Sequence, residues 1–239
     1  MRIDKLLANL GYGSRKEVKD LLKSGVVKVN DQTVKNGKEQ VDPEKDTVTL
    51  HGEVIEYKEY IYLMMNKPQG VISATEDHYE KTVIDLLEME DAVYSPFPVG
   101  RLDKDTEGLL LLTNDGQLAH QLLSPKKHVP KTYFAVIDQE VTDADVKAFQ
   151  EGVTLDDGYV TKPGMLKILK SGIRSDIELT ITEGKFHQVK RMFEAVGKKV
   201  VYLQRISMGP LRLDESLELG EYRELTDEEI TAIKEVNTK

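Results

Sequence analysis

The chain has 239 residues, and its 33 lysines and arginines against 42 aspartates and glutamates give a formal net charge of −9 at pH 7. Such a charge argues against a protein that coats nucleic acid with a generally basic surface. The absence of cysteine excludes disulfides, thiolate metal sites and cysteine nucleophiles. The composition is that of a globular protein, and no apolar run approaches the roughly 20 residues of a membrane span. We therefore expect a soluble, cytoplasmic protein that has no membrane partner.

Positive charge is concentrated in two segments of this acidic chain. Residues 1–38 contain nine cations and four carboxylates, and residues 185–205 contain six cations and one carboxylate. The rest of the chain is strongly acidic. The distribution predicts two local positive surfaces.

The N-terminal segment predicts two short helices followed by strands. The first helix is predicted by four apolar residues at helical spacing, Ile3, Leu6, Leu7 and Leu10. Glycines 11 and 13 end it. The second helix begins at Ser14, where Glu17 completes a capping box, and it ends at Gly25. Apolar runs near residues 26–29 and 48–50, with a turn at Asn30 and Asp31, complete a small αα-ββ module.

The second predicted helix carries a basic face. At 100° per residue, four cations fall within one arc of about 100° beside the apolar arc: Arg15, Lys16, Lys19 and Lys23. Charged residues often only solvate a helix, but this clustering favours a binding surface. The segment 2–37 resembles the S4 RNA-binding domain. The resemblance implies that the basic face lies along an RNA phosphate backbone, where contacts supply sequence-independent affinity.

A larger domain follows a polar, turn-rich linker. The segments 42–46 and 52–59 place the boundary near residue 58, which gives an S4-like domain and linker at 1–58 and a second domain at 59–239. Strands are expected at 60–65, 109–113, 133–137, 177–182 and 200–206. Capping pairs, Thr142 with Asp145 and Thr226 with Glu229, open two of the helices. The pattern predicts an α+β fold with a mixed, mostly antiparallel sheet flanked by helices.

The densest charged motif is GRLDKDTEGLLLLTNDG at residues 100–116. An EF-hand loop beginning at Asp103 would have Asn114 in place of the final glutamate, and leucines would fill half of its ligand positions. An aspartyl-phosphate phosphatase would need the apolar strand before the acids, whereas here the strand follows them. We therefore expect no metal site. On these residues alone, a solvated turn without chemistry stays an alternative.

The neighbouring motifs favour a specific family. The motif at 100–116 resembles the catalytic signature of the pseudouridine synthases, in the branch typified by the small-subunit ribosomal RNA enzyme. Further motifs of this family are matched at 66–70 (NKPQG), 131–133 (KTY), 183–193 (EGKFHQVKRMF) and 203–209. With the S4-like segment, the resemblance covers nearly the whole chain. It implies that a uridine within RNA is isomerised without a metal, a nucleotide or any other cofactor.

The resemblance also implies roles for individual residues. Asp103 matches the essential aspartate, which either adds to ribose C1′ or removes a sugar proton, and Lys190 matches its basic partner. Tyr133 matches the tyrosine that packs against the target uracil. Arg101 matches the residue that fills the gap left by the extruded nucleotide.

Helix geometry gives two neighbouring cations different directions. In the helix expected near 189–196, Lys190 lies 100° from Val189, at the edge of the buried face, so it can reach a site. Arg191 lies 200° from Val189, points outward, and is expected to meet RNA phosphate. Without the resemblance, Lys190 would be interpreted as a lysine whose stem covers apolar surface.

The remaining polar residues of the motifs receive lesser roles. Two further cations are expected to contact RNA, Lys67 and Lys185. Asp105, Thr106 and Glu107 are expected to hold the loop through local hydrogen bonds. His187 is interpreted as structural or RNA-facing.

The HQVKRMF motif at residues 187–193 and the short C-terminal tail most resemble those of enzymes that modify uridine 516 of 16S ribosomal RNA. The expected partner is ribosomal RNA, in a small-subunit assembly intermediate. Two alternatives stay open: an enzyme of the same branch that acts on 23S ribosomal RNA, and a non-catalytic RNA-binding assembly factor that kept the fold. Asp103 argues against the second, since a pure binder gains nothing from a carboxylate beside phosphates.

Overall fold

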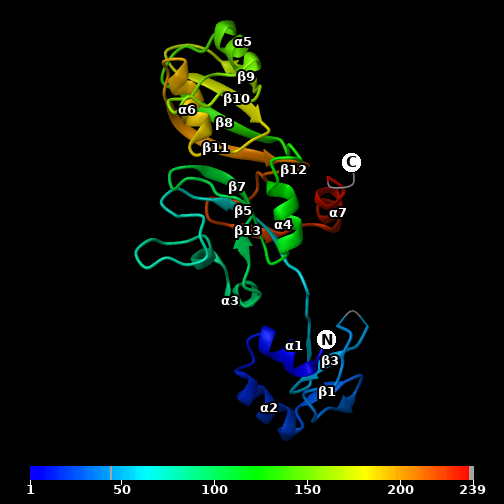
Figure 1. Cartoon of the computed structure of the whole chain (residues 1–239). Helices are drawn as coiled ribbons and strands as arrows, with labels where there is room; N and C mark the ends of the chain where they lie inside the picture. The colour runs from blue at the N-terminus through cyan, green and yellow to red at the C-terminus, as the bar shows by residue number, and fades with distance from the viewer. Residues whose placement is uncertain (44, 237–239) are drawn as a thin grey trace. The chain divides into compact units, whose positions relative to one another are not determined.

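The computed structural model describes residues 1–43 and 45–236, and the chain divides into two compact units (Figure 1). The first comprises Met1–Ile61 and Glu88–Pro96, and the second comprises Tyr62–Leu87 and Phe97–Lys239. Residue 44 of the predicted linker and residues 237–239 of the predicted second domain lie outside the described residues. The functional boundary at residue 58 stays a prediction.

The first unit packs two helices on a four-stranded sheet of order β2-β1-β3-β4. Its elements are α1 (Ile3–Asn9), α2 (Arg15–Ser24), β1 (Val27–Val29), β2 (Gln32–Thr33), β3 (Val48–Leu50), β4 (Glu53–Ile55) and, from the second segment, α3 (Met89–Ala92). Both predicted helices and the capping box of Ser14 with Glu17 are confirmed. Strands β2 and β4 were not predicted, because two or three mostly exposed residues give no detectable alternation.

The second unit is built on one large sheet of order β13-β5-β7-β11-β8-β10-β9. Its strands are β5 (Tyr62–Lys67), β6 (Phe97–Pro98), β7 (Glu107–Thr113), β8 (Lys131–Ile137), β9 (Met165–Lys170), β10 (Ser175–Ile181), β11 (Val200–Met208), β12 (Leu211–Arg212) and β13 (Tyr222–Glu224). Along this order, only the β7–β11 pair is parallel. The α+β class with a mixed, mostly antiparallel sheet is therefore confirmed, as are the five predicted strands.

Helices flank the sheet at both ends. They are the 3-10 turn η1 (Ile84–Leu86) and α4 (Gly116–Leu123), α5 (Asp143–Glu151), α6 (Gln188–Ala195) and α7 (Asp227–Glu235). In Figure 1, α5 and α6 lie at the β8–β10 end, and α4 and α7 lie beside the β5–β7 half. The apolar faces of α4 and α7 share one core with β5 and β7. The predicted capping boxes at Thr142 and Thr226 are confirmed. None of the described helices has the length and apolarity required to cross a bilayer.

The parallel β7–β11 pair fixes the start of β7, and with it the charged loop that comes just before. Gly108 pairs with Arg205 and has a φ of 103°. A Cβ at this position would lie 2.3 Å from the Arg205 carbonyl oxygen, so only glycine allows the two backbones to approach. This close approach sets the loop at residues 101–106 beside the centre of the sheet.

Candidate active site

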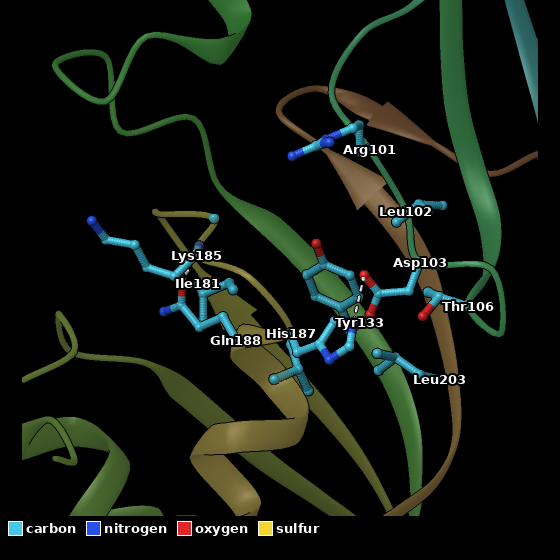
Figure 2. A pocket seen from close by; sticks show the side chains of 12 residues that line it. Arg101, Leu102, Asp103, Thr106, Tyr133, Ile181, Lys185, His187, Gln188 and Leu203 are labelled. Carbon is cyan, nitrogen blue, oxygen red and sulfur yellow. Dashed lines mark hydrogen bonds and ion pairs between the residues drawn. The ribbon is translucent and has the colours of Figure 1, made fainter. Parts of the chain in front are cut away.

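A cavity of about 90 Å³ in the second unit is lined by segments that are distant in the sequence. Most of its lining comes from the loop 101–106, strand β8 and the turn 184–189 that leads into α6, and strands β10 and β11 contribute Ile181 and Leu203. Figure 2 shows the Asp103 carboxylate facing the Tyr133 ring and the His187 imidazole, with Arg101 at the rim. The structure therefore brings together four of the predicted site residues here: Arg101, Asp103, Tyr133 and Lys185.

Lys190 joins the two carboxylates of the charged loop. Its Nζ donates to Asp103 Oδ2 at 3.1 Å and to Asp105 Oδ1 at 2.6 Å. Burial lowers the pKa of Lys190, but the hydrogen bonds to Asp105 and Asp103 outweigh it, so the pKa is raised. Burial alone would raise the pKa of Asp105, but the hydrogen bond and charge of Lys190 outweigh burial, so the pKa of Asp105 is lowered overall. Lys190 and Asp105 are thus both held in their charged forms, which keeps a positive charge next to Asp103.

Lys67 is buried beneath the loop 101–106 and donates hydrogen bonds to main-chain carbonyl oxygens in and beside it. Its side chain is fully buried, and its Nζ donates to the carbonyl oxygens of Pro68 at 2.9 Å, Asp103 at 3.0 Å and Thr106 at 2.9 Å. All three ammonium protons are therefore used by the main chain. The prediction that Lys67 contacts RNA is wrong, because the side chain is fully buried. A single lysine in a sequence motif gives no indication that it is buried. Burial lowers its pKa to about 8, against the opposing charges of Asp103 and Asp105.

The other acids of the loop act differently from their predicted local role. Asp105 binds Lys190, as described, and Glu107 accepts a 2.6 Å hydrogen bond from the hydroxyl of Tyr202 on β11. The Thr106 hydroxyl is buried without a hydrogen-bond partner among the described residues. One local hydrogen bond is present, from the Thr106 amide to the Asp103 carbonyl oxygen at 3.1 Å. The loop is also held by the distant Ser73, whose hydroxyl donates to the Leu102 carbonyl oxygen at 2.9 Å and accepts from the Leu102 amide at 3.0 Å. No local pattern in the sequence indicates this contact between Ser73 and Leu102, which are 29 residues apart.

Helix α6 aims Lys190 at the loop, as its periodicity predicted. Val189, Met192 and Phe193 are buried under the helix. His187 precedes the helix in a left-handed conformation with φ 48°, and its Nε2 lies 3.6 Å from Asp103 Oδ1. The structure therefore brings His187 to the site, although it was predicted only as structural or RNA-facing.

Arg191 is not free on the surface. Its Nε donates to Asp156 Oδ1 at 2.6 Å, and its Nη2 lies 2.7 Å from Asp157 Oδ2. Two carboxylates on one guanidinium offset its charge. Its contact with RNA stays a prediction, and the structure supplies a competing set of partners.

The basic face of α2 lies in the first unit and has the expected geometry. Val18 and Leu22 are buried, whereas its four cations are exposed. The Nζ of Lys23 lies 4.0 Å from Asp20 Oδ1. RNA binding by this face stays a prediction.

Two cations that the sequence analysis did not assign lie close to Tyr133. Lys131 is two residues earlier on β8, so alternation puts it on the same face of the sheet. Arg205 pairs directly with Tyr133 on β11 and is buried. A signal was present for Arg205, because it interrupts a largely apolar strand, whereas Lys131 is the first residue of β8 and lies outside the strand predicted at 133–137. Within residues 1–43 and 45–236, no group of three or more acidic or histidine side chains could hold a metal ion.

Comparisons with known proteins agree with this geometry. A family model for RNA pseudouridylate synthase matches residues 61–195, and an S4 domain model matches residues 1–48. The chain is 57% identical over 236 residues to the uncharacterized RNA pseudouridine synthase YtzG of Bacillus subtilis (strain 168), covering 98% of this chain and 99% of that protein. It is 38% identical to ribosomal small subunit pseudouridine synthase A of Escherichia coli (strain K12), covering 98% and 100%. A crystal structure of a pseudouridylate synthase matches with a TM-score of 0.68 at 40% identity, covering 98% and 99%.

Proposed function

The chain belongs to the RNA pseudouridylate synthase family and carries an N-terminal S4 domain, and from that premise we propose that it isomerises uridine 516 of 16S ribosomal RNA, with Asp103 as the attacking group. The observation that carries the proposal is the Asp103 carboxylate, held by Lys190 at 3.1 Å and facing Tyr133 in one cavity. The reaction cleaves the bond between uracil N1 and ribose C1′, turns the ring and joins C5 to C1′.

Each residue of the cavity then has a task. Asp103 attacks the nucleoside, and Lys190 orients that carboxylate through its hydrogen bond to Oδ2. Tyr133 offers a flat face to the extruded uracil, with stacking that contributes about 1–3 kcal/mol. Arg101, at the rim, occupies the gap that the nucleotide leaves, which offsets part of the cost of extrusion.

The choice of small-subunit RNA is supported by relatives rather than by the cavity. Several proteins named ribosomal small subunit pseudouridine synthase A are 38–41% identical to this chain over nearly its full length. The exposed cations of α2 supply the sequence-independent contact that a large structured RNA requires. We expect the substrate to be a small-subunit assembly intermediate in the cytoplasm, where the target nucleotide is accessible.

The proposal is tested by release of tritium from 5-tritiated uridine. The label leaves when C5 bonds to ribose, so release reports the isomerisation itself. Small- and large-subunit RNA are offered both naked and in partly assembled particles. We expect release from small-subunit RNA, with the partly assembled particle as the better substrate.

Two outcomes decide against parts of the proposal. Release from large-subunit RNA alone would overturn the substrate assignment and leave an enzyme of the same family. Tight RNA binding without release from any substrate would favour the non-catalytic assembly factor.

A further inference from the structure

A second cavity of about 270 Å³ opens beside the active-site cavity and shares Arg101, Tyr133 and Lys185 with it. Its lining contains five cations and a single carboxylate. The cations are Arg101, Lys131, Lys162, Lys185 and Arg205, and the carboxylate is Glu183. A hollow with this lining has a strongly positive potential.

Arg205 lines this cavity and has an unused hydrogen-bond donor. Its side chain is 2% exposed, and its Nε donates to the Leu109 carbonyl oxygen at 2.8 Å. Its Nη2 is buried without a hydrogen-bond partner in the part of the chain that the structure describes. An unsatisfied buried donor on a charged group is costly, so its retention at this position indicates a missing acceptor.

Lys131 adds a second cation that lacks a counter-charge. Its Nζ donates to the Val129 carbonyl oxygen at 3.1 Å. Burial, together with the nearby charge of Arg205, lowers its pKa to about 8. Among the described residues, neither Lys131 nor Arg205 forms an ion pair with a carboxylate.

The carboxylate of the cavity is already engaged elsewhere. Glu183 Oε2 accepts from the Tyr159 hydroxyl at 2.7 Å, and Oε1 accepts from the Lys162 amide at 3.0 Å and from Gln188 Nε2 at 2.6 Å. Glu183 therefore holds the turn before α6 and leaves the two cations without an anion.

We propose that Lys131 and Arg205 bind a phosphodiester of the substrate RNA within one nucleotide of the target uridine. This inference rests on the proposed function and adds a substrate contact to the same site. Lys131 and Tyr133 are two residues apart on one face of β8, which separates them by about 6.6 Å along the strand. Arg205 lies opposite Tyr133 on β11. A nucleotide whose base stacks on Tyr133 would therefore bring a flanking phosphate within reach of both cations.

The physical reason is the cost of two desolvated like charges. In the free protein, Lys131 and Arg205 repel each other with little water to screen them. A phosphate oxygen would accept charge-assisted hydrogen bonds from both and remove the repulsion. Binding is thereby coupled to the correct seating of the uridine on Tyr133.

The test removes the charge of the Lys131 side chain and the charge of the RNA backbone, separately and together, and compares the four binding affinities. Pentauridylate and its methylphosphonate analogue are titrated against the full chain and against Lys131→Met at constant ionic strength. We expect loss of backbone charge to weaken binding to the wild-type protein about tenfold more than binding to Lys131→Met. Lys170→Met, on an exposed lysine of β9, is the matched control and should behave as the wild type.

Two results would overturn the inference. One is an equal loss of affinity in both proteins, because the phosphates would then be bound elsewhere. The other is no loss in the wild type. Phosphate contacts by α2 are common to all the variants, so they cancel in the comparison.

Thermal unfolding gives an independent readout. Lys131→Met should raise the melting temperature, because it removes a buried repulsion. A lower melting temperature, or a variant that does not fold, would mean that Lys131 is structural and would contradict the inference. Failure of the proposed function would appear separately, as absence of tritium release, and would leave these binding results unchanged.

Discussion

The basic face of α2 and the cations around Asp103 use the same residue types in opposite physical settings. Arg15, Lys16, Lys19 and Lys23 project into solvent, where their attraction for phosphate is long-ranged, non-specific and screened by salt. Lys67, Lys131, Lys190 and Arg205 are enclosed, and each donates at least one defined hydrogen bond, while Arg205 Nη2 has no partner among the described residues. The difference teaches that net charge says little about function here. We expect the exposed group to supply salt-dependent affinity, and the buried group to position the catalytic loop and the target nucleotide.

The largest expected effect separates chemistry from affinity at Asp103. Asp103→Asn keeps the shape of the side chain but removes its negative charge, so turnover should fall at least about 10³-fold. RNA affinity should stay within about twofold, because the exposed cations of α2, which we expect to contact phosphates, are unchanged. Tritium release under single-turnover conditions measures the first quantity and filter binding the second. Residual turnover above a few per cent would contradict the attacking role of Asp103.

The next largest effect is expected at α2, where substitution should weaken RNA affinity and leave the catalytic rate unchanged. Replacing Arg15, Lys16, Lys19 and Lys23 with glutamine should reduce the slope of log affinity against log salt by about 3, at about 0.7 per phosphate contact. The single-turnover rate at saturating RNA should be unchanged, since these residues lie outside the cavity. A double variant at two exposed lysines of the second unit, Lys147→Gln with Lys170→Gln, serves as the control. An unaltered slope would show that α2 does not touch RNA.

Features that depend on nearby residues could be predicted from the sequence, whereas features that depend on long-range contacts could not. The face of α2, the aim of Lys190 and the three capping boxes depend on residues within a few positions of one another, so local periodicity predicted them. The burial of Lys67 and the partners of Arg191 depend on chain segments that are brought together only by the sheet order. The contact of Ser73 with Leu102 and the pairing of Arg205 with Tyr133 have the same long-range origin.

A smaller effect concerns the stability cost of the enclosed cations. Burial lowers the pKa of Lys67 to about 8, below its value in the unfolded chain. Between about pH 8 and pH 10 the unfolded state therefore binds more protons, and the free energy of unfolding should rise with pH, by up to about 1 kcal/mol per pH unit from this group. Lys67→Met should remove that part of the slope.

The same variant has a second, pH-independent effect. It leaves three main-chain carbonyl oxygens without their donor, so stability at pH 7 should fall by about 1–3 kcal/mol. Urea unfolding at several pH values measures both effects. The substitution Lys16→Gln on α2 is the control and should change neither quantity by more than a few tenths of a kcal/mol. Equal pH slopes in Lys67→Met and the wild type would contradict the assigned burial cost.

The smallest expected effect comes from Arg191, which belongs to neither group. Its guanidinium lies at a helix surface but is largely covered and already bound by Asp156 and Asp157. Arg191→Gln should therefore change RNA affinity less than about twofold and leave the salt slope unaltered, whereas the single substitution Lys16→Gln should lower the slope by about 0.7. Filter binding over a range of salt concentrations compares the two variants directly. If Arg191→Gln lowers the slope as much as Lys16→Gln, the two aspartates release Arg191 when RNA binds, and pairing in the free protein does not decide which cations serve affinity.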